Sequence, residues 1–197
     1  MKYTDIRQNL RSKKVGIAGA GGLGSNCAVA LARSGVGTLV ICDFDSVEAA
    51  NLNRQAYSSN QVGELKTIAL KENIRNIDAE INVITYEEKL SQENIPVIYR
   101  DCDVIVEAFD DAGMKEMILQ TVQESLPGIP LIIGSGIAGW GCSESIKCRK
   151  IDDLLFVCGD ESTEVDDENP PIAPRVGIVA NMQANTVLEI LLSKPGM

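Results

Sequence analysis

The chain has 197 residues, of which 45% are hydrophobic, and its 28 acidic and 18 basic side chains give a formal net charge of -10. This length is enough for one domain with a sizeable core, and the negative charge argues against sequence-independent binding of nucleic acid. The sequence contains no histidine, which excludes Ser-His-Asp and Cys-His catalysis and every histidine-ligated metal site.

Membrane and metal-binding patterns are also missing from the sequence. No apolar run reaches the ~18 residues of a transmembrane helix, and residues 1–14 are too polar for a signal peptide. None of the six cysteines forms a C-x-x-C pair, so no structural zinc is expected. We therefore expect a cytoplasmic protein with free cysteines and no membrane partner.

The chain begins with a polar segment over residues 1–13, predicted as a short helix or arm, which contains Arg7. A strand over 14–19 and a helix over 22–34 follow. The turn between them contains the three glycines of the pattern G-x-G-x-x-G, which are Gly19, Gly21 and Gly24. Glycines let the backbone approach a phosphate, and the helix N-terminus attracts the anion. The pattern indicates a nucleotide or dinucleotide site, although a plain tight turn would show it too.

A second buried strand over 38–42 ends at Asp43, 19 residues beyond Gly24. A carboxylate at this end of the second strand is placed to accept hydrogen bonds from ribose hydroxyls, although it would also serve to cap a turn. An irregular segment follows and carries Asn51 and Arg54, which share one face if the segment turns helically.

Lys66 lies in the first turn of a helix predicted over 64–76. A lysine at a helix N-terminus opposes the helix dipole and is slightly unfavourable on a plain surface. A nearby polyphosphate would explain its position.

The next elements extend the sheet. The pattern predicts strands over 81–86, 103–108 and 130–134, a short helix or turn over 91–100, and a longer helix over 113–125. Asp110 and Asp111 follow one of these strands, and carboxylates at the carboxyl end of a strand face the ligand crevice of a doubly wound sheet. Two short strands of an antiparallel edge are expected next, over 144–150 and 154–158, and a closing helix is expected over 177–192.

Together these elements predict one α/β domain over residues 1–197. Its core is a Rossmann-like, mostly parallel twisted sheet with helices on both faces and a short antiparallel extension near the C-terminus. The segment 159–169 contains six carboxylates and is followed by three prolines within 170–174. It is too polar to pack, so we interpret it as either a solvated linker or a mobile loop that covers a substrate.

Several of these features occur together in one known family. They are G-A-G-G-L-G at 19–24, D-F-D at 43–45, N-L-N-R-Q at 51–55, Lys66 and Asp110. Over about residues 14–137 the combination resembles the ThiF/MoeB/HesA family, the bacterial relatives of ubiquitin-activating enzymes, and its N-x-x-R-Q element is much more specific than the glycine motif. The short chain and the run A-P-R-V-G at 173–177 look most like the compact ThiF-type branch that serves thiamine biosynthesis.

The resemblance implies an enzyme that uses MgATP to adenylate the C-terminal glycine carboxylate of a small ubiquitin-like sulfur carrier protein. Pyrophosphate is released, the carrier is ThiS-like and ends in Gly-Gly, and the product serves synthesis of the thiamine thiazole. The resemblance also implies a homodimer. A carboxylate that attacks a polyanion needs positioning and neutralised phosphate charge more than a proton-transferring base. A histidine-free site can supply both.

Eight positions of the implied nucleotide site are present, and they are Gly21, Gly22, Asp43, Asn51, Arg54, Lys66, Asp110 and Asp111. By resemblance, the glycines let the backbone approach the nucleotide and Asp43 holds the ribose. Asn51 and Arg54 bind phosphate oxygens, and Lys66 neutralises the departing pyrophosphate. Asp110 holds the Mg²⁺ ion that accompanies ATP. The expected catalytic residues are Arg54, Lys66 and Asp110.

The chain departs from the family pattern in three ways. Most members carry two C-x-x-C pairs for a structural zinc, and this sequence has none. In larger relatives an N-terminal arginine reaches the phosphates of the other subunit, and Arg7 is the candidate for such a contact in trans, although it lies closer to the glycine turn. Some relatives use a loop cysteine in sulfur transfer; Cys148 and Cys158 lie in that region, but core or strand thiols are the simpler interpretation.

Three other functions stay open from the sequence. An NAD-dependent Rossmann oxidoreductase would share the glycine motif and Asp43, but it would leave Arg54 and Lys66 without a role. A non-catalytic binding module would be expected to have lost Arg54, Lys66 or Asp110. A molybdopterin-type carrier would be adenylated by the same chemistry, so the pathway stays open.

Overall fold

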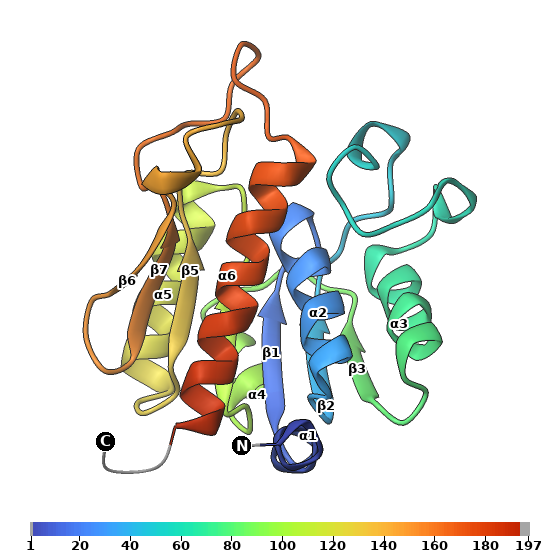
Figure 1. Ribbon diagram of the computed structural model, residues 1–197, viewed down its shortest axis with the longest axis vertical. Coiled ribbons are helices and arrows are strands. Elements are labelled where there is room, and N and C mark those ends of the chain that lie inside the picture. The colour runs from blue at the N-terminus through green and yellow to red at the C-terminus, as the bar shows by residue number, and fades with distance from the viewer. Residues whose placement is uncertain (1, 194–197) are drawn as a thin grey trace.

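A seven-stranded, mostly parallel sheet forms the centre of the protein (Figure 1). The structure is a computed structural model that describes residues 2–193. In sheet order, the strands are β3 (Asn82–Tyr86), β2 (Thr38–Cys42), β1 (Lys14–Ala18), β4 (Val104–Glu107), β5 (Leu131–Gly134), β7 (Leu155–Gly159) and β6 (Lys147–Lys150). The chain moves outward from β1 in one direction and returns to start again at β4. This change of direction is where doubly wound sheets place their ligands.

Helices cover both faces of this sheet. Within residues 2–193 they are α1 (Tyr3–Leu10), α2 (Gly22–Ser34), α3 (Lys66–Ile77), α4 (Ile95–Tyr99), α5 (Ala112–Ser125) and α6 (Ala173–Leu192). In Figure 1, α2, α3 and α6 lie in front of the sheet, α4 and α5 lie behind it, and α1 lies below its lower edge. None of these helices is both long and apolar enough to cross a bilayer.

Alternate residues of the central strands feed two apolar cores. In β1, Val15 and Ile17 pack with residues of α2 and α6, whereas Ala18 packs with residues of α4 and α5. A strand buried on both faces has a continuous apolar sequence rather than an alternating one. This is why the short apolar runs predicted the inner strands.

The structure confirms the predicted fold class, but it moves the start of the last helix and changes the direction of one edge strand. The last helix begins at Ala173 rather than at 177, because Pro174 fits the first turn of a helix, where its missing N–H would have no helical partner. Of the two short strands expected at the edge, only β6 is antiparallel. β7 continues the parallel sheet beside β5.

The acidic segment after β7 differs from the expectation that it is too polar to pack. Its residues 164–168 are exposed, but the side chain of Asp160 at its start is only 3% exposed and forms an ion pair with Arg175 of α6. A buried carboxylate is tolerated here because a cation and several hydrogen bonds satisfy it.

Candidate functional site

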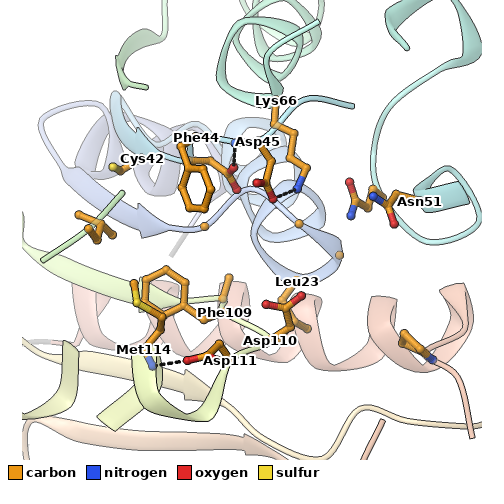
Figure 2. A pocket seen from close by; sticks show the side chains of 18 of the residues that line it. Leu23, Cys42, Phe44, Asp45, Asn51, Lys66, Phe109, Asp110, Asp111 and Met114 are labelled. Carbon is orange, nitrogen blue, oxygen red and sulfur yellow. Dashed lines mark hydrogen bonds and ion pairs between the residues drawn. The ribbon is translucent and has the colours of Figure 1, made fainter. Parts of the chain in front are cut away.

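A cavity of about 590 Å³ opens at the carboxyl edge of β1, β2 and β4. The turns after these strands, the irregular segment before α3, the start of α3 and the acidic segment all contribute to its walls. All eight positions expected in a nucleotide site line this cavity: Gly21, Gly22, Asp43, Asn51, Arg54, Lys66, Asp110 and Asp111. Figure 2 shows Asp45 and Lys66 on one side and Asp110 and Asp111 on the other.

The glycine turn forms the floor between β1 and α2. A Cβ atom on Gly24 would lie 1.9 Å from the carbonyl oxygen of Gly19, so only glycine allows the helix to begin this close to the strand. The helix starts at Gly22, and the N–H groups of a first turn have no partners within their own helix. The turn thus presents free donors and the positive end of the α2 dipole to the cavity.

The carboxylate of Asp43 is hydrogen-bonded to the backbone of the glycine turn. Its Oδ2 accepts a hydrogen bond of 2.6 Å from the N–H of Ala20, and its Oδ1 accepts one of 2.8 Å from the N–H of Asp45. Burial raises the pKa of Asp43, and the two hydrogen bonds and the nearby Lys66 oppose that effect. Each carboxylate oxygen retains a second lone pair for a ligand hydroxyl.

Lys66 is the first residue of α3 and its side chain is 6% exposed. Its Nζ lies 2.7 Å from Oδ2 of Asp45, whose side chain is 51% exposed. The side chain is thus buried in the wall of the cavity. The carboxylate of Asp45 offsets the unfavourable helix dipole and is a partner that a phosphate group could replace.

The irregular segment holds Asn51 and Arg54 on one side of a short turn. The Nη2 of Arg54 donates to Oδ1 of Asn51 at 3.3 Å, and Nη1 donates to Oδ1 of Asn53 at 2.9 Å. The side chain of Asn26 in α2 donates to the carbonyl oxygen of Arg54 at 2.9 Å. Asn51 and Arg54 therefore share a face, as predicted, and α2 holds them beside the glycine turn.

The opposite wall carries two carboxylates with different roles. Oδ1 of Asp111 accepts a hydrogen bond of 2.8 Å from the N–H of Met114 and caps the start of α5. The carboxylate of Asp110 makes no hydrogen bond or ion pair with any side chain or backbone group in the described range 2–193. The whole carboxylate of Asp110 is therefore available to a cation.

A buried ion pair supports this wall from behind. The carboxylate of Glu107 is fully buried, lies 2.8 Å from Nζ of Lys115 and accepts a hydrogen bond of 2.5 Å from the N–H of Phe109. Burial raises the pKa of Glu107, and Lys115 opposes that effect. The pair fixes the turn after β4 that leads to Asp110.

Three candidate residues lie outside the cavity. Nη2 of Arg7 pairs with Oδ2 of Asp78 at 2.7 Å, and α1, which carries Arg7, lies at the opposite edge of the sheet (Figure 1). Cys148 and Cys158 lie opposite each other on β6 and β7. These two thiols are part of the sheet edge, as the simpler interpretation predicted.

Sequence reasoning missed the residues that hold the site together. Tyr57 donates to the carbonyl oxygen of Ala20 at 2.7 Å and joins the irregular segment to the glycine turn, and Asn26, Asp45 and Glu107 serve as described above. Most of these side chains bond to backbone groups, which leave no residue pattern to recognise. Asp45 alone offered a signal, because it stands two residues after Asp43 at the strand end.

The doubly wound sheet, the glycine turn at a helix N-terminus and the cavity at the change of strand direction define a Rossmann-like α/β protein. The chain belongs to the ThiF family, whose family model matches residues 3–197. It is 31% identical over 191 residues to the adenylyltransferase and sulfurtransferase MOCS3 of Caenorhabditis briggsae, with 93% of this chain and 47% of that protein covered. It is 38% identical over 129 residues to the adenylyltransferase and sulfurtransferase uba4 of Emericella nidulans, with 65% of this chain and 26% of that protein covered. The chain thus spans about half of these relatives or less.

Solved structures share the fold. The E. coli tRNA N6-threonylcarbamoyladenosine dehydratase TcdA in complex with AMP matches with a TM-score of 0.85 at 20% identity, covering 95% of this chain and 89% of that one. The E. coli MccB structure with ATP matches with a TM-score of 0.72 at 23% identity, covering 97% of this chain and 60% of that one.

Proposed function

We propose that the protein is an ATP-dependent adenylyltransferase that acts on the C-terminal glycine carboxylate of a small ubiquitin-like sulfur carrier protein. One observation carries the proposal: the cavity brings the start of α2 together with Arg54, Lys66 and Asp110. Family membership and the names of the relatives, which are adenylyltransferases, support it. The complexes of TcdA with AMP and of MccB with ATP are consistent with a nucleotide in this fold.

In this reaction the carrier carboxylate oxygen bonds to the α-phosphorus of ATP while the bond from that phosphorus to the pyrophosphate oxygen breaks. No proton is transferred, so the site needs no histidine. Negative charge grows on the departing pyrophosphate, and preorganised cations stabilise such charge most effectively where water is excluded. Arg54 and the buried Lys66 would supply these cations, and Asn51 would position Arg54.

A Mg²⁺ ion would enter with ATP. No cluster of three or more His, Cys, Asp or Glu side chains that could hold a metal exists within residues 2–193, whereas Asp110 presents a carboxylate without a protein partner. Mg²⁺ is commonly held by one or two carboxylates together with substrate phosphates and water. The donor set therefore fits an ion shared with the nucleotide, which would neutralise phosphate charge.

The acidic segment is the proposed cover of the carrier tail. Val165 from this segment and Pro171, just after it, line the cavity. An extended Gly-Gly tail would pass beneath them, because glycine alone fits a narrow passage, and the closed segment would keep water from the acyl-adenylate. The carboxylates at 164–168 would favour a carrier with a basic face.

We further propose that the carrier is ThiS-like and serves the thiamine thiazole, on the strength of A-P-R-V-G at 173–177. A molybdopterin-type carrier is the alternative, because the same chemistry would serve it. An NAD-dependent oxidoreductase is disfavoured by the family and by the cations in the cavity.

The test is exchange of labelled pyrophosphate into ATP with purified carriers. A ThiS-like and a molybdopterin-type carrier should each be compared with a copy of itself that lacks the last glycine. We expect Mg²⁺-dependent exchange with the intact ThiS-like carrier and none with its shortened form. No exchange with any carrier, together with enhanced NADH fluorescence on binding, would instead support the oxidoreductase.

A further inference from the structure

Arg175 occupies an electrostatically unfavourable position. It is in the first turn of α6, where the helix dipole repels cations, and its side chain is 3% exposed. The structure shows two partners: one terminal nitrogen forms an ion pair with Asp160, and Nη1 donates to the carbonyl oxygen of Gly141 at 2.6 Å. Arg175 therefore binds two loops to the start of α6 at once.

Asp160 connects the same two loops. Its Oδ1 accepts hydrogen bonds from the N–H groups of Ser162 at 2.9 Å and Thr163 at 2.8 Å, and Oγ1 of Thr163 accepts one from the N–H of Ala138 at 3.3 Å. Although burial acts in the opposite direction, these hydrogen bonds and Arg175 lower the pKa of Asp160 to about 2. The carboxylate is thus ionised at neutral pH. We call the segments 135–142 and 160–171 the mouth loops.

The mouth loops shape one wall of the cavity. Ile137, Val165 and Pro171 from these loops line it, as does Val176, the residue after Arg175. A Cβ atom on Gly22 would lie 3.1 Å from Cγ1 of Val176, so the start of α6 also touches the glycine turn. Arg175 does not line the cavity, but it fixes the residues that do.

We propose that Arg175 is a positioning residue that, through its ion pair with Asp160, holds the mouth loops where the carrier tail enters the cavity. This inference rests on the proposed function. Loss of the ion pair should loosen the wall over the tail and leave the nucleotide-binding turns intact, since those are held by Asp43, Asn26 and Tyr57. The effect should therefore fall on the carrier and on exclusion of water, and much less on ATP.

Steady-state kinetics of Arg175→Gln, Arg175→Lys and Asp160→Asn test this inference. In Arg175→Gln and Asp160→Asn we expect the KM for the carrier to rise ~10-fold or more, with little change in the KM for ATP, because misplaced positioning groups cost rates of this order. Hydrolysis of ATP without carrier product should increase. Arg175→Lys keeps the charge and should recover part of the loss.

Arg149→Gln is the matched control. Arg149 also pairs with a carboxylate of the mouth loops, Glu161, but its side chain is 57% exposed, so its loss should change little. If Arg175→Gln fails to fold, Asp160→Asn breaks the same ion pair with a side chain of equal size. The inference would be overturned if the KM values for ATP and for the carrier rose equally, or if the KM for the carrier stayed unchanged in Asp160→Asn. Absence of exchange in the wild-type protein would instead count against the proposed function itself.

A separate observation concerns two thiols at the sheet edge. Cys148 of β6 lies opposite Cys158 of β7 in the antiparallel pair. The N–H of Ile151 donates to the carbonyl oxygen of Leu155, so by alternation Cys148 and Cys158 form a pair without hydrogen bonds, in which Cα atoms are ~4.5 Å apart and side chains are closest. This separation lies within the range of disulfides. Both sulfur atoms contact Oγ1 of Thr186, at 3.2 and 3.8 Å.

We infer that Cys148 and Cys158 form a dithiol that hydrogen peroxide oxidises to a disulfide. The exposed Cys148 thiolate attacks one peroxide oxygen, the O–O bond breaks, and the departing hydroxide takes a proton to become water. Cys158 then attacks the sulfur of the resulting sulfenic acid. The S–S bond forms, the S–O bond breaks, and a second water leaves with the proton of Cys158.

Mass spectrometry of peroxide-treated protein tests this second inference. We expect a loss of two hydrogens and a cross-linked peptide pair that contains both cysteines, reversed by dithiothreitol and absent from Cys158→Ser. Cys142 is the control, because it is exposed but not paired across strands. Cys27 and Cys42 should not react, since both are buried and neither lies opposite another cysteine in the sheet. A disulfide that involves Cys142, or sulfinic acid at Cys148 without the cross-link, would refute the inference.

Discussion

Three buried charged side chains decide the geometry of the cavity, and each has an opposite charge within reach. Lys66 pairs with Asp45, Glu107 with Lys115 and Arg175 with Asp160. A buried ion pair adds little net stability compared with apolar side chains of the same size, but breaking one leaves an uncompensated charge. These pairs are therefore better understood as devices that fix the positions of loops and cations than as a source of stability.

Arg54→Ala and Lys66→Met should each slow pyrophosphate exchange by at least ~100-fold, the scale of losing one preorganised charge donor. Arg75→Ala is the control, since Arg75 is an exposed residue of α3 that lies outside the cavity. Circular dichroism should show that each variant is folded. Nearly normal exchange in both Arg54→Ala and Lys66→Met would mean that the cavity is not the site of adenylation.

The ion pair of Asp160 should appear in the pH dependence of stability. The pKa of this carboxyl is about 2 in the folded protein, against 3.8 for an unperturbed aspartate. A lowered pKa contributes stability that is fully present above about pH 4 and is lost as the pH falls towards about 2, a contribution of about 2 kcal/mol. Urea unfolding at pH 7 and pH 3 should show a difference between wild type and Asp160→Asn that shrinks at the lower pH. A difference independent of pH would contradict this assignment.

Among the elements, the inner strands and the helices that follow them were predictable because burial on both faces leaves a continuous apolar run. The carboxyl-edge placement of Asp43 and Asp110 followed from topology, whereas Arg54 was assigned to the site by the family resemblance through its N-x-x-R-Q element. The defined conformation of the mouth loops could not be predicted. It depends on the ion pair between Asp160 and Arg175, which lie 15 positions apart in a polar stretch. Local pattern describes such a stretch as a linker, and only the fold brings its two ends together.

Substitution by alanine should change the stability of the protein in opposite directions at two helical glycines, Gly24 of α2 and Gly177 of α6. Gly24→Ala forces a Cβ atom to within 1.9 Å of the carbonyl oxygen of Gly19 and should destabilise the protein by at least ~2 kcal/mol. Gly177→Ala meets nothing within 4 Å and should stabilise α6 by ~0.5–1 kcal/mol. Thermal unfolding of the two variants checks both directions. A stable Gly24→Ala protein would show that the close approach of α2 to β1 is not required.

For the whole molecule, the sheet separates two ends with different tasks. The cavity lies at the carboxyl edge of the strands, whereas α1 and the ion pairs of Arg7 and Arg11 with Asp78 lie at the other edge. The apolar cores on both faces connect these ends, and the sequence contains no cysteine pair with zinc spacing. Folding and catalysis should therefore respond differently when metal ions are removed.

Removal of metal should leave the fold intact and stop the reaction. Treatment of the nucleotide-free protein with EDTA should not change its melting temperature, because no cysteine pair with zinc spacing exists. Pyrophosphate exchange should cease in EDTA and return with added Mg²⁺. Stoichiometric zinc in the purified protein, or a large drop in melting temperature, would show that a metal supports the fold.

The position of Arg7 gives a test of self-association. Because α1 lies at the edge opposite the cavity (Figure 1), Arg7 cannot reach the site of its own chain, so any role in catalysis requires a second subunit. If a homodimer forms, as the family resemblance predicts, Arg7 of one subunit would complete the site of the other. Arg7→Ala and Lys66→Ala proteins should then each be inactive, and mixing them should restore part of the activity, because some hybrid dimers contain one intact site. Sedimentation of the wild-type protein as a monomer, or no recovery after subunit exchange has been demonstrated with labelled chains, would leave Arg7 as a structural partner of Asp78 alone.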